Sequence, residues 1–269
     1  MTKTRLLPVL FMLLISSTSW GLPQNDPVPG GVAVLAVEAP HADNLHFKGS
    51  PVMVIEEDGN HYAIVGISLA AEPGRYALHY GDEPAYSFTV NPRNYAEQRL
   101  TIENKRKVNP YQEDLERIRR ESSEMNQAFT NFDRSLPVTT EFELPAEGPV
   151  SSPFGLKRFL NDQPRSPHSG LDIAADTGEP IKAPAPGKVT ATGDYFFNGK
   201  TVIEDHGQGL VTMYGHMSRI DVKSGDMVEA GEIIGAIGQT GRVTGPHLHW
   251  SVSLNNARVN PNLFLDRTP

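Results

Sequence analysis

The sequence predicts a mainly β protein with two β domains and one helical connector between them. Most of the chain consists of short apolar segments separated by turns, and 24 glycines and 22 prolines are spread among its 269 residues. One stretch alone has helical periodicity. The length suits one or two domains with a buried core. The predicted parts are a signal peptide (1–21), an N-terminal β domain (22–95), a helical connector (96–136) and a C-terminal antiparallel β domain (137–269).

The first 21 residues are typical of a secretory signal peptide. Lys3 and Arg5 precede the ten-residue apolar run 6–15, which is too short to span a membrane. Ser19 and Gly21 are small residues at the minus-three and minus-one positions, so we expect cleavage after Gly21 and no membrane span afterwards. A retained membrane anchor is the competing interpretation. The chain contains no cysteine, which excludes a lipoprotein.

The N-terminal domain is predicted to contain two β-hairpins. Residues 22–30 are rich in proline and glycine and are expected to be extended. Segments 51–57 and 61–69 flank Asp58-Gly59-Asn60, which is a hairpin turn signal. Segments 76–80 and 85–90 flank a second turn at 81–83. We expect a small β domain, such as a partial sandwich.

The connector is predicted to form one amphipathic helix. Its apolar residues are spaced by four, three, seven, four and three positions, at Tyr111, Leu115, Ile118, Met125, Phe129 and Phe132. Asn109 is the expected N-cap, with Pro110 at the first helical position, and Pro137 ends the segment. The apolar stripe is expected to pack against the chain's own domains; binding of a partner helix is the alternative.

The C-terminal domain is predicted to be β again, without a substantial helix. Residues 141–149 form the linker that leads into it. Five strands separated by glycine-rich turns are expected, at 188–191, 201–204, 210–214, 232–237 and 247–253.

Five residues of this domain have the spacing of a mononuclear zinc site: His168, Asp172, His216, His247 and His249. His247 and His249 lie two apart on a predicted strand, so both would face one side while Leu248 and Trp250 face a core. Such a strand can offer one imidazole to a metal and another to whatever binds that metal. A catalytic zinc needs three protein ligands and an open position, so this set has two histidines to spare.

The remaining histidines have no metal spacing. His206 is expected to be structural because Asp205-His206-Gly207 is typical of a tight turn, and the four histidines of the N-terminal half receive no role. Since there is no cysteine, a metal would have to bind nitrogen and oxygen ligands. The formal net charge is −8, which argues against nucleic acid or an anionic membrane surface as a partner.

From about Glu147 to Leu265 the chain resembles the LytM, or lysostaphin-type (M23), zinc metallopeptidases, which cut peptidoglycan cross-links. The motifs that carry the resemblance are His168-x-x-x-Asp172, Tyr214-x-His216 and His247-x-His249, with Gly187-Lys188-Val189, Asp205-His206-Gly207 and the glycine-rich stretch 231–241 around them. Two positions depart from the usual pattern. Ser169 replaces an arginine that often follows the first histidine, and Ser251 replaces an acidic residue, which puts substrate preference in question.

The resemblance implies a LytM-type metallopeptidase domain with one Zn²⁺ per chain, bound by His168, Asp172 and His249. It implies that His216 and His247 are the catalytic histidines, with the base and oxyanion roles undivided between them. Tyr214 is either a substrate contact or a core residue. The implied substrate is the peptide of peptidoglycan, and in a periplasm the bond would be the D-alanyl–diaminopimelate cross-link. Together with the signal peptide, this predicts a periplasmic metalloendopeptidase.

Two other functions were weighed. A LytM-like protein can activate a cell-wall amidase without being an enzyme, but such proteins typically lack metal ligands. Residues 222–231 resemble half of a biotinyl or lipoyl hairpin, yet the chain has no Met-Lys-Met or Asp-Lys-Ala tripeptide to modify. Two roles are consistent with residues 22–136: they restrain the catalytic domain by covering its metal site, or they only space or target it.

Overall fold

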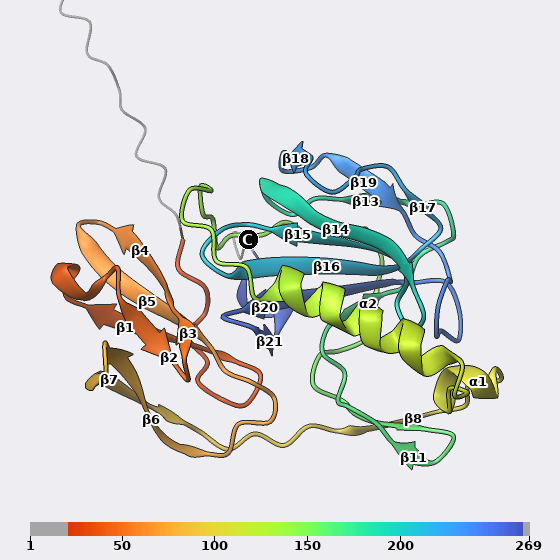
Figure 1. Cartoon of the computed structure of the whole chain (residues 1–269), viewed down its shortest axis with the longest axis horizontal. Coiled ribbons are helices and arrows are strands. Elements are labelled where there is room, and N and C mark those ends of the chain that lie inside the picture. The colour runs from red at the N-terminus through yellow and green to blue at the C-terminus, as the bar shows by residue number, and fades with distance from the viewer. Residues whose placement is uncertain (1–20, 266–269) are drawn as a thin grey trace, which may run out of the picture.

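The computed structural model describes residues 21–265, and the predicted signal peptide lies outside this range except for Gly21. The described chain is mainly β, with antiparallel sheets, one long helix and only short helical turns besides (Figure 1). The predicted fold class is therefore confirmed. Between residues 21 and 265, no helix has the length and apolar character needed to cross a bilayer.

The N-terminal domain consists of two small sheets packed on each other (Figure 1, left). One sheet has the order β1-β5-β4, with bounds Val32–Val37, Asn60–Gly66 and Met53–Glu57. The other has the order β3-β2-β6-β7, with bounds Ser50–Pro51, Leu45–Phe47, Gly74–Tyr80 and Glu83–Val90. Both predicted hairpins are present, as β4–β5 and β6–β7. Asp58 and Gly59 have φ of 50° and 74°, as a two-residue hairpin turn with positive φ at both positions requires.

The N-terminal domain is fixed to the C-terminal domain through a shared core and through a turn. Val32, Met53 and Ile64 belong to the same buried cluster as the apolar residues of the C-terminal sheet. The Asn255 side chain accepts from the Gly66 amide at 2.6 Å and donates to the Gly66 carbonyl at 3.1 Å. Asn255 follows β20 (Leu248–Leu254), so at roughly 3.3 Å per residue this junction is about 20 Å from the start of that strand.

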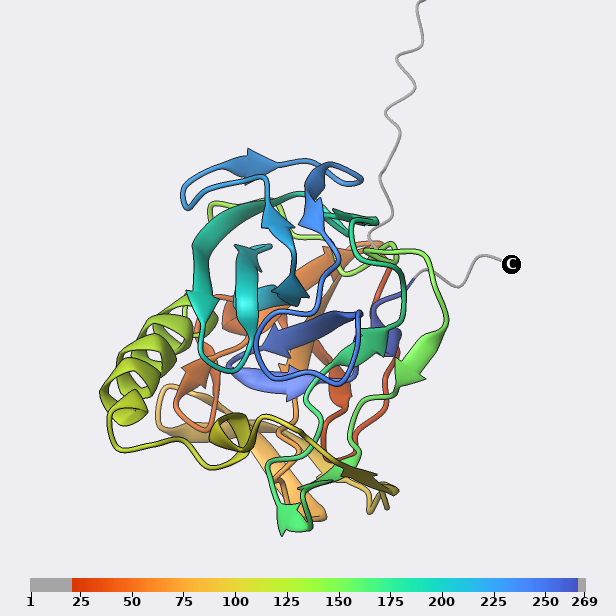
Figure 2. The ribbon, with the colours of Figure 1, turned by 90° about the vertical axis from the view of Figure 1, so that its right-hand side faces the viewer.

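The C-terminal domain is built on an eight-stranded antiparallel sheet of order β18-β14-β15-β16-β20-β12-β9, with β21 paired to β20. Its bounds are β9 Val150–Ser152, β12 Leu171–Ile173, β14 Gly187–Tyr195, β15 Gly199–Asp205, β16 Leu210–Met217, β18 Met227–Val228 and β21 Ala257–Val259. A three-stranded sheet of order β13-β19-β17 covers its edge, with bounds Pro180–Lys182, Ile233–Ala236 and Arg219–Ile220. Figure 2 shows how these strands curve around the core.

Four of the five predicted strands lie within or close to β14, β15, β16 and β20, and the fifth corresponds to β19. The short strands β9, β12, β13, β17, β18 and β21 were not all predicted, because two or three residues carry no usable periodicity. Between residues 137 and 265, the one helical element is the 3₁₀ turn Pro261–Leu263; the N-terminal domain has a similar 3₁₀ turn at Ala39–His41. The expectation that it lacks a substantial helix is confirmed over the described residues.

The helical connector differs from its prediction at its N-terminal end. Asn109 is the C-cap of a short helix, α1 (Lys105–Val108), and the long helix α2 (Asp114–Phe129) begins after Glu113. The predicted N-cap at Asn109 is therefore wrong. The physical reason is local: the carboxylate of Asp114 accepts from the Tyr111 amide at 2.9 Å and from the Arg106 guanidinium at 2.6 Å, which holds residues 109–113 outside the helix.

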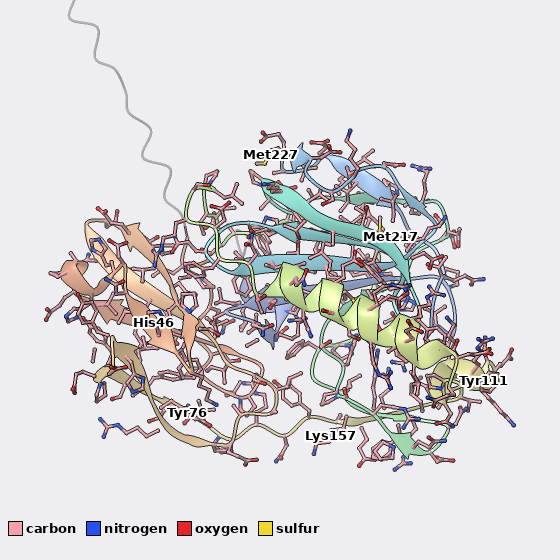
Figure 3. All side chains as sticks on the ribbon, in the orientation of Figure 1. His46, Tyr76, Tyr111, Lys157, Met217 and Met227 are labelled. Atoms are coloured by element: carbon pink, nitrogen blue, oxygen red, sulfur yellow. The ribbon has the colours of Figure 1, made fainter. Side chains whose placement is uncertain are left out.

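Only the C-terminal half of α2 uses the predicted apolar stripe. Met125 and Phe129 pack on Ile203 and Met213 of β15 and β16, which confirms packing on the chain's own domain. Tyr111 is 58% exposed and lies at the edge of the molecule beside α1 (Figure 3). The middle of the helix is attached by polar contacts instead, such as the Glu121 carboxylate, which accepts from the Phe196 amide at 2.7 Å.

After the N-terminal domain, the chain runs beneath the C-terminal sheet as a separate strand. This strand, β8 (Glu97–Leu100), pairs in parallel with β10 (Lys157–Leu160), which forms a hairpin with β11 (Gln163–Pro164). Figure 3 places Lys157 in this lower layer. The predicted helical connector begins at residue 96, but Glu97–Leu100 form a strand, because pairing with β10 and not local propensity decides their conformation.

Candidate metal centre

Three predicted residues bring their side-chain donor atoms together in the C-terminal domain. His168 Nε2 lies 2.9 Å from Asp172 Oδ1, His249 Nδ1 lies 2.7 Å from the same oxygen, and the two nitrogens are 3.1 Å apart. All three side chains are buried. Among residues 21–265, this is the only group of three or more His, Asp, Glu or Cys side chains with converging donor atoms.

The pairing of two strands explains this convergence. In the antiparallel pair β12–β20, Asp172 lies directly opposite His249, so their side chains leave the same face of the sheet. Leu248 and Trp250 point to the other face and are fully buried in the core, as the alternation in the sequence predicts. The loop before β12 supplies His168, whose backbone amide donates to the Leu156 carbonyl at 2.9 Å.

Neighbouring groups fix which nitrogen of each histidine faces the cluster. His168 Nδ1 lies 2.8 Å from the Pro153 carbonyl, which can only accept, so Nδ1 carries the proton and Nε2 presents its lone pair. His249 Nε2 lies 2.9 Å from the Ser251 hydroxyl, which leaves Nδ1 for the cluster. Such outer partners orient metal-binding imidazoles. Ser251, which departs from the family's usual acidic residue, therefore still provides an oxygen for this purpose.

The second oxygen of Asp172 is held by a cation. Arg158 donates to Asp172 Oδ2 at 2.9 Å, and its Nε donates to the side-chain oxygen of Gln98 at 3.1 Å. Gln98 in turn donates to the Ser152 hydroxyl at 3.0 Å. The carboxylate therefore offers one oxygen, Oδ1, to the cluster, and strand β8 of the connector takes part in holding it there.

These residues fit a zinc ion. The donor set is two imidazole nitrogens and one carboxylate oxygen, each oriented by its own partner, which is a typical ligand set for a catalytic zinc with an open fourth position. Cysteine is absent from the chain, so no thiolate competes for the metal. Whether these three residues are the ligands remains a prediction.

The two remaining predicted residues, His216 and His247, lie beside the cluster. Their ring centroids are 4.9 Å apart, and His247 Nε2 is 3.9 Å from Asp172 Oδ1. His216 Nδ1 lies 2.8 Å from the Thr240 carbonyl, and His247 Nδ1 lies 2.9 Å from the Gly245 carbonyl. Both rings therefore carry a proton on Nδ1, which leaves Nε2 as the nitrogen that is not bound to the backbone.

His216 also has an unusual backbone conformation. Its φ is 64°, in the left-handed region that costs energy for a residue with a side chain, and its amide donates to the Asn198 carbonyl at 2.7 Å. The residue follows Gly215, at the end of β16, where the strand leaves its regular pairing with β20. Strain of this kind is often found where a side chain must be aimed at a functional site.

Burial and neighbouring charges set the protonation states. Burial, followed by the nearby His249 and His247, lowers the pKa of His216 to about 3. Burial also lowers the pKa of His249 to about 4, against the opposing effect of Asp172. For Asp172, burial is outweighed by the close contacts of the carboxylate with the imidazoles of His168 and His249, which hold the pKa of the carboxyl well below its usual range. At neutral pH Asp172 is therefore ionised and the His249 imidazole is neutral, as metal binding requires of these ligand types.

Two hollows open beside the cluster. One, of about 190 Å³, is lined by Asp172, His216 and His247 and, on its other side, by residues of the connector: Gln98, Leu100 and Ile102. The second, of about 150 Å³, is lined by His168, His216 and His249. Both are smaller than the roughly 300–1,000 Å³ of typical ligand sites, so a branched substrate would need the groove to widen.

Two further predictions can be compared with the structure. Tyr214 is fully buried and donates to Glu204 at 2.8 Å, so it is a core residue and not a substrate contact. His206 is fully buried between the Pro186 carbonyl and the Thr212 hydroxyl, as its structural role predicts. The sequence analysis missed Arg158 and Gln98, whose place at the site depends on the β8–β10 pairing and leaves no sequence signal.

Two family models match the chain. Residues 166–261 match the model described as peptidase family M23, and residues 25–93 match the model described as the peptidase family M23 N-terminal domain. A crystal structure from Pseudomonas aeruginosa described as a peptidase M23 is 44% identical; the similarity covers 89% of this chain and 95% of that one, with a TM-score of 0.75.

Two curated relatives match over less than half of the chain. The DD-carboxypeptidase/endopeptidase Mpg of Neisseria meningitidis is 40% identical over 112 residues, and the peptidoglycan DD-endopeptidase ShyA of Vibrio cholerae is 39% identical over 112 residues. The similarity covers 42% and 41% of this chain, but only 26% of each relative. The chain thus matches about a quarter of the length of these two proteins.

Proposed function

The chain belongs to peptidase family M23, and we propose that it is a zinc-dependent endopeptidase that cuts peptide cross-links of peptidoglycan. The observation that carries the proposal is the convergence of His168, Asp172 and His249 beside two histidines that are not needed as ligands. Relatives named as peptidoglycan DD-endopeptidases support the substrate class.

The proposed division of labour follows from the geometry. A zinc ion bound by His168, Asp172 and His249 would lower the pKa of a bound water and polarise a peptide carbonyl. His216 and His247 have Nδ1 bound to backbone carbonyls, so their Nε2 atoms are the ones that would accept a proton beside the metal and return it to the leaving amine. The segment His-Glu-x-x-His is absent, so no helical glutamate performs this step.

The other residues of the site position these groups. Arg158 holds one oxygen of Asp172, and Ser251 holds His249, so the ligands do not have to be ordered when the metal arrives. The carbonyls of Thr240 and Gly245 keep the acceptor nitrogens of the two histidines directed toward the cluster.

The bond that we propose is the D-alanyl–diaminopimelate cross-link, in a periplasm reached through the predicted signal peptide. The proposed domain boundaries are those of the sequence analysis, with the catalytic domain at 137–269. A non-enzymatic activator of an amidase is the second candidate, but a chain with all five residues of the metal and histidine set does not favour it.

Metal analysis tests the ligand assignment. Purified protein should contain one zinc per chain, and His249→Ala should lose it while retaining its fold by circular dichroism. His46→Ala, in the N-terminal domain, is the matched control and should keep its zinc. Equal zinc content in wild type and His249→Ala would show that the metal, if any, lies elsewhere.

A further inference from the structure

The groove beside the metal centre contains three arginines with little negative charge to balance them. Arg158 and Arg242 line both hollows, and Arg165 lines the second. The only carboxylate in either lining is Asp172, which already interacts with both histidines of the cluster and with Arg158. The whole chain, by contrast, carries a net charge of −8, so the lining of the groove differs in sign from the chain as a whole.

Of these three arginines, Arg242 has the fewest hydrogen-bond partners. Between residues 21 and 265 its guanidinium has no carboxylate within 4.0 Å, and its one hydrogen bond is a 3.5 Å contact to the Lys107 carbonyl. Arg165, by comparison, donates to four neutral oxygens, which include the Val108 carbonyl at 3.0 Å. Most of the five N–H donors of Arg242 are therefore available to a ligand in the hollows.

The position of Arg242 is nevertheless well defined. Its backbone amide donates to the Phe197 carbonyl at 2.8 Å, and its guanidinium lies 4.6 Å from the centroid of the Phe197 ring. Stacking on an aromatic ring fixes the plane of a guanidinium and leaves its N–H edges free. Burial, and then the charges of Arg158 and Arg165, lower the pKa of Arg242 to about 10, so its charge is unfavourable until an anion approaches.

We propose that Arg242 binds a carboxylate of the substrate next to the bond that is cut, and that Arg165 and Arg158 reinforce this anion site. The inference rests on the proposed function, which it deepens by naming a substrate feature. In the proposed cross-link, the diaminopimelate unit carries a free carboxylate at the carbon whose amine forms the bond. A planar guanidinium with free edges suits such a group because it can bind both oxygens at once.

The test compares two substrates that differ only in this charge: a cross-linked muropeptide with the diaminopimelate carboxylate free, and the same compound with that group as a carboxamide. Wild type should cleave the free carboxylate with kcat/KM about tenfold or more above that for the carboxamide, as expected for loss of a charge-assisted hydrogen bond. Arg242→Gln should lose this preference through a larger fall in kcat/KM for the free carboxylate than for the carboxamide, with unchanged zinc content.

Two variants serve as controls. Arg242→Lys keeps the charge without the planar fork and should keep part of the preference. Arg219→Gln removes an arginine that is exposed and paired with Asp221, outside the groove, and should leave the preference unchanged.

Four results would overturn the proposal or the function on which it rests. If wild type cleaves both compounds equally, or if Arg242→Gln slows both by the same factor, Arg242 does not read the carboxylate. If zinc-loaded wild type cleaves neither compound, the proposed function is wrong. In that case, calorimetry with the uncut free-carboxylate compound tests the anion site separately from cleavage. Equal affinity of wild type and Arg242→Gln for this compound would refute the anion site.

Discussion

Gly170 gives a sharp test of how the metal ligands are held, because it has no room for a side chain. A Cβ added there would lie 2.7 Å from Cε1 and 2.8 Å from Nε2 of His249, and 2.5 Å from the carbonyl oxygen of Trp250. Ordinary contacts begin at 3.4 Å, so the imidazole would have to move by roughly 0.7 Å in a close-packed interior. Since φ at Gly170 is not positive, alanine is permitted by the backbone and only the steric effect is tested.

We expect Gly170→Ala to displace His249 from its partner Ser251 and to weaken zinc binding about 10- to 100-fold, which corresponds to about 1.4–2.8 kcal/mol. Zinc affinity is measured by competition with a chromogenic chelator, and circular dichroism checks the fold. Gly245→Ala is the matched control: it makes the same change two residues before His247, where an added Cβ meets nothing within 4 Å. The reasoning is refuted if folded Gly170→Ala binds zinc as tightly as wild type, or if Gly245→Ala weakens binding equally.

Three further predictions concern the histidines, the core and the connector. His216→Ala and His247→Ala should each keep zinc but cleave a cross-linked muropeptide at least about 100-fold more slowly, as expected for loss of a general acid–base group; loss of zinc from either would make that residue a ligand. Burial raises the pKa of Glu204 from 4.5 to about 8 in the folded protein. The stabilisation that comes from the protonated carboxyl is therefore complete below pH 4.5 and is lost as pH rises to 8. Glu204→Gln should therefore gain stability over wild type by about 1.4 kcal/mol per pH unit in that window, measured by urea unfolding; a difference independent of pH would contradict it. Gln98→Ala removes the hydrogen bonds of β8 to Arg158 and Ser152. If the connector restrains the groove, losing about 1 kcal/mol of the free energy that holds β8 in place should raise turnover about fivefold. An unchanged rate would favour a connector that acts only as a spacer.

The sequence predicted the parts of the site that depend on local patterns. His249, Leu248 and Trp250 alternate along one strand, so the face of each side chain follows from a period of two. The same reasoning predicts both hairpins of the N-terminal domain, because Asp58-Gly59 allows a turn of positive φ. The resemblance to the M23 family, which the histidine and aspartate motifs carry, is confirmed.

The parts that the sequence did not predict depend on contacts between distant segments. Strand β8 is polar and short, and only its pairing with β10 places Gln98 beside Arg158. The start of α2 was placed too early because Asp114 competes for the Tyr111 amide, which a capping rule for Asn109 does not include. Arg242 lies in a loop with no periodicity, and its position depends on Phe197 from another turn.

Digestion of purified peptidoglycan, followed by chromatography and mass spectrometry of the released muropeptides, tests the central claim most directly. Zinc-loaded protein should convert cross-linked dimers to monomers, each cut adding one water, and a chelator should stop the reaction until zinc is restored. His249→Ala, prepared in parallel, should leave the dimers intact. Persistence of the dimers with zinc-loaded, folded wild-type protein, or equal cleavage by His249→Ala, would contradict a zinc endopeptidase built on His168, Asp172 and His249.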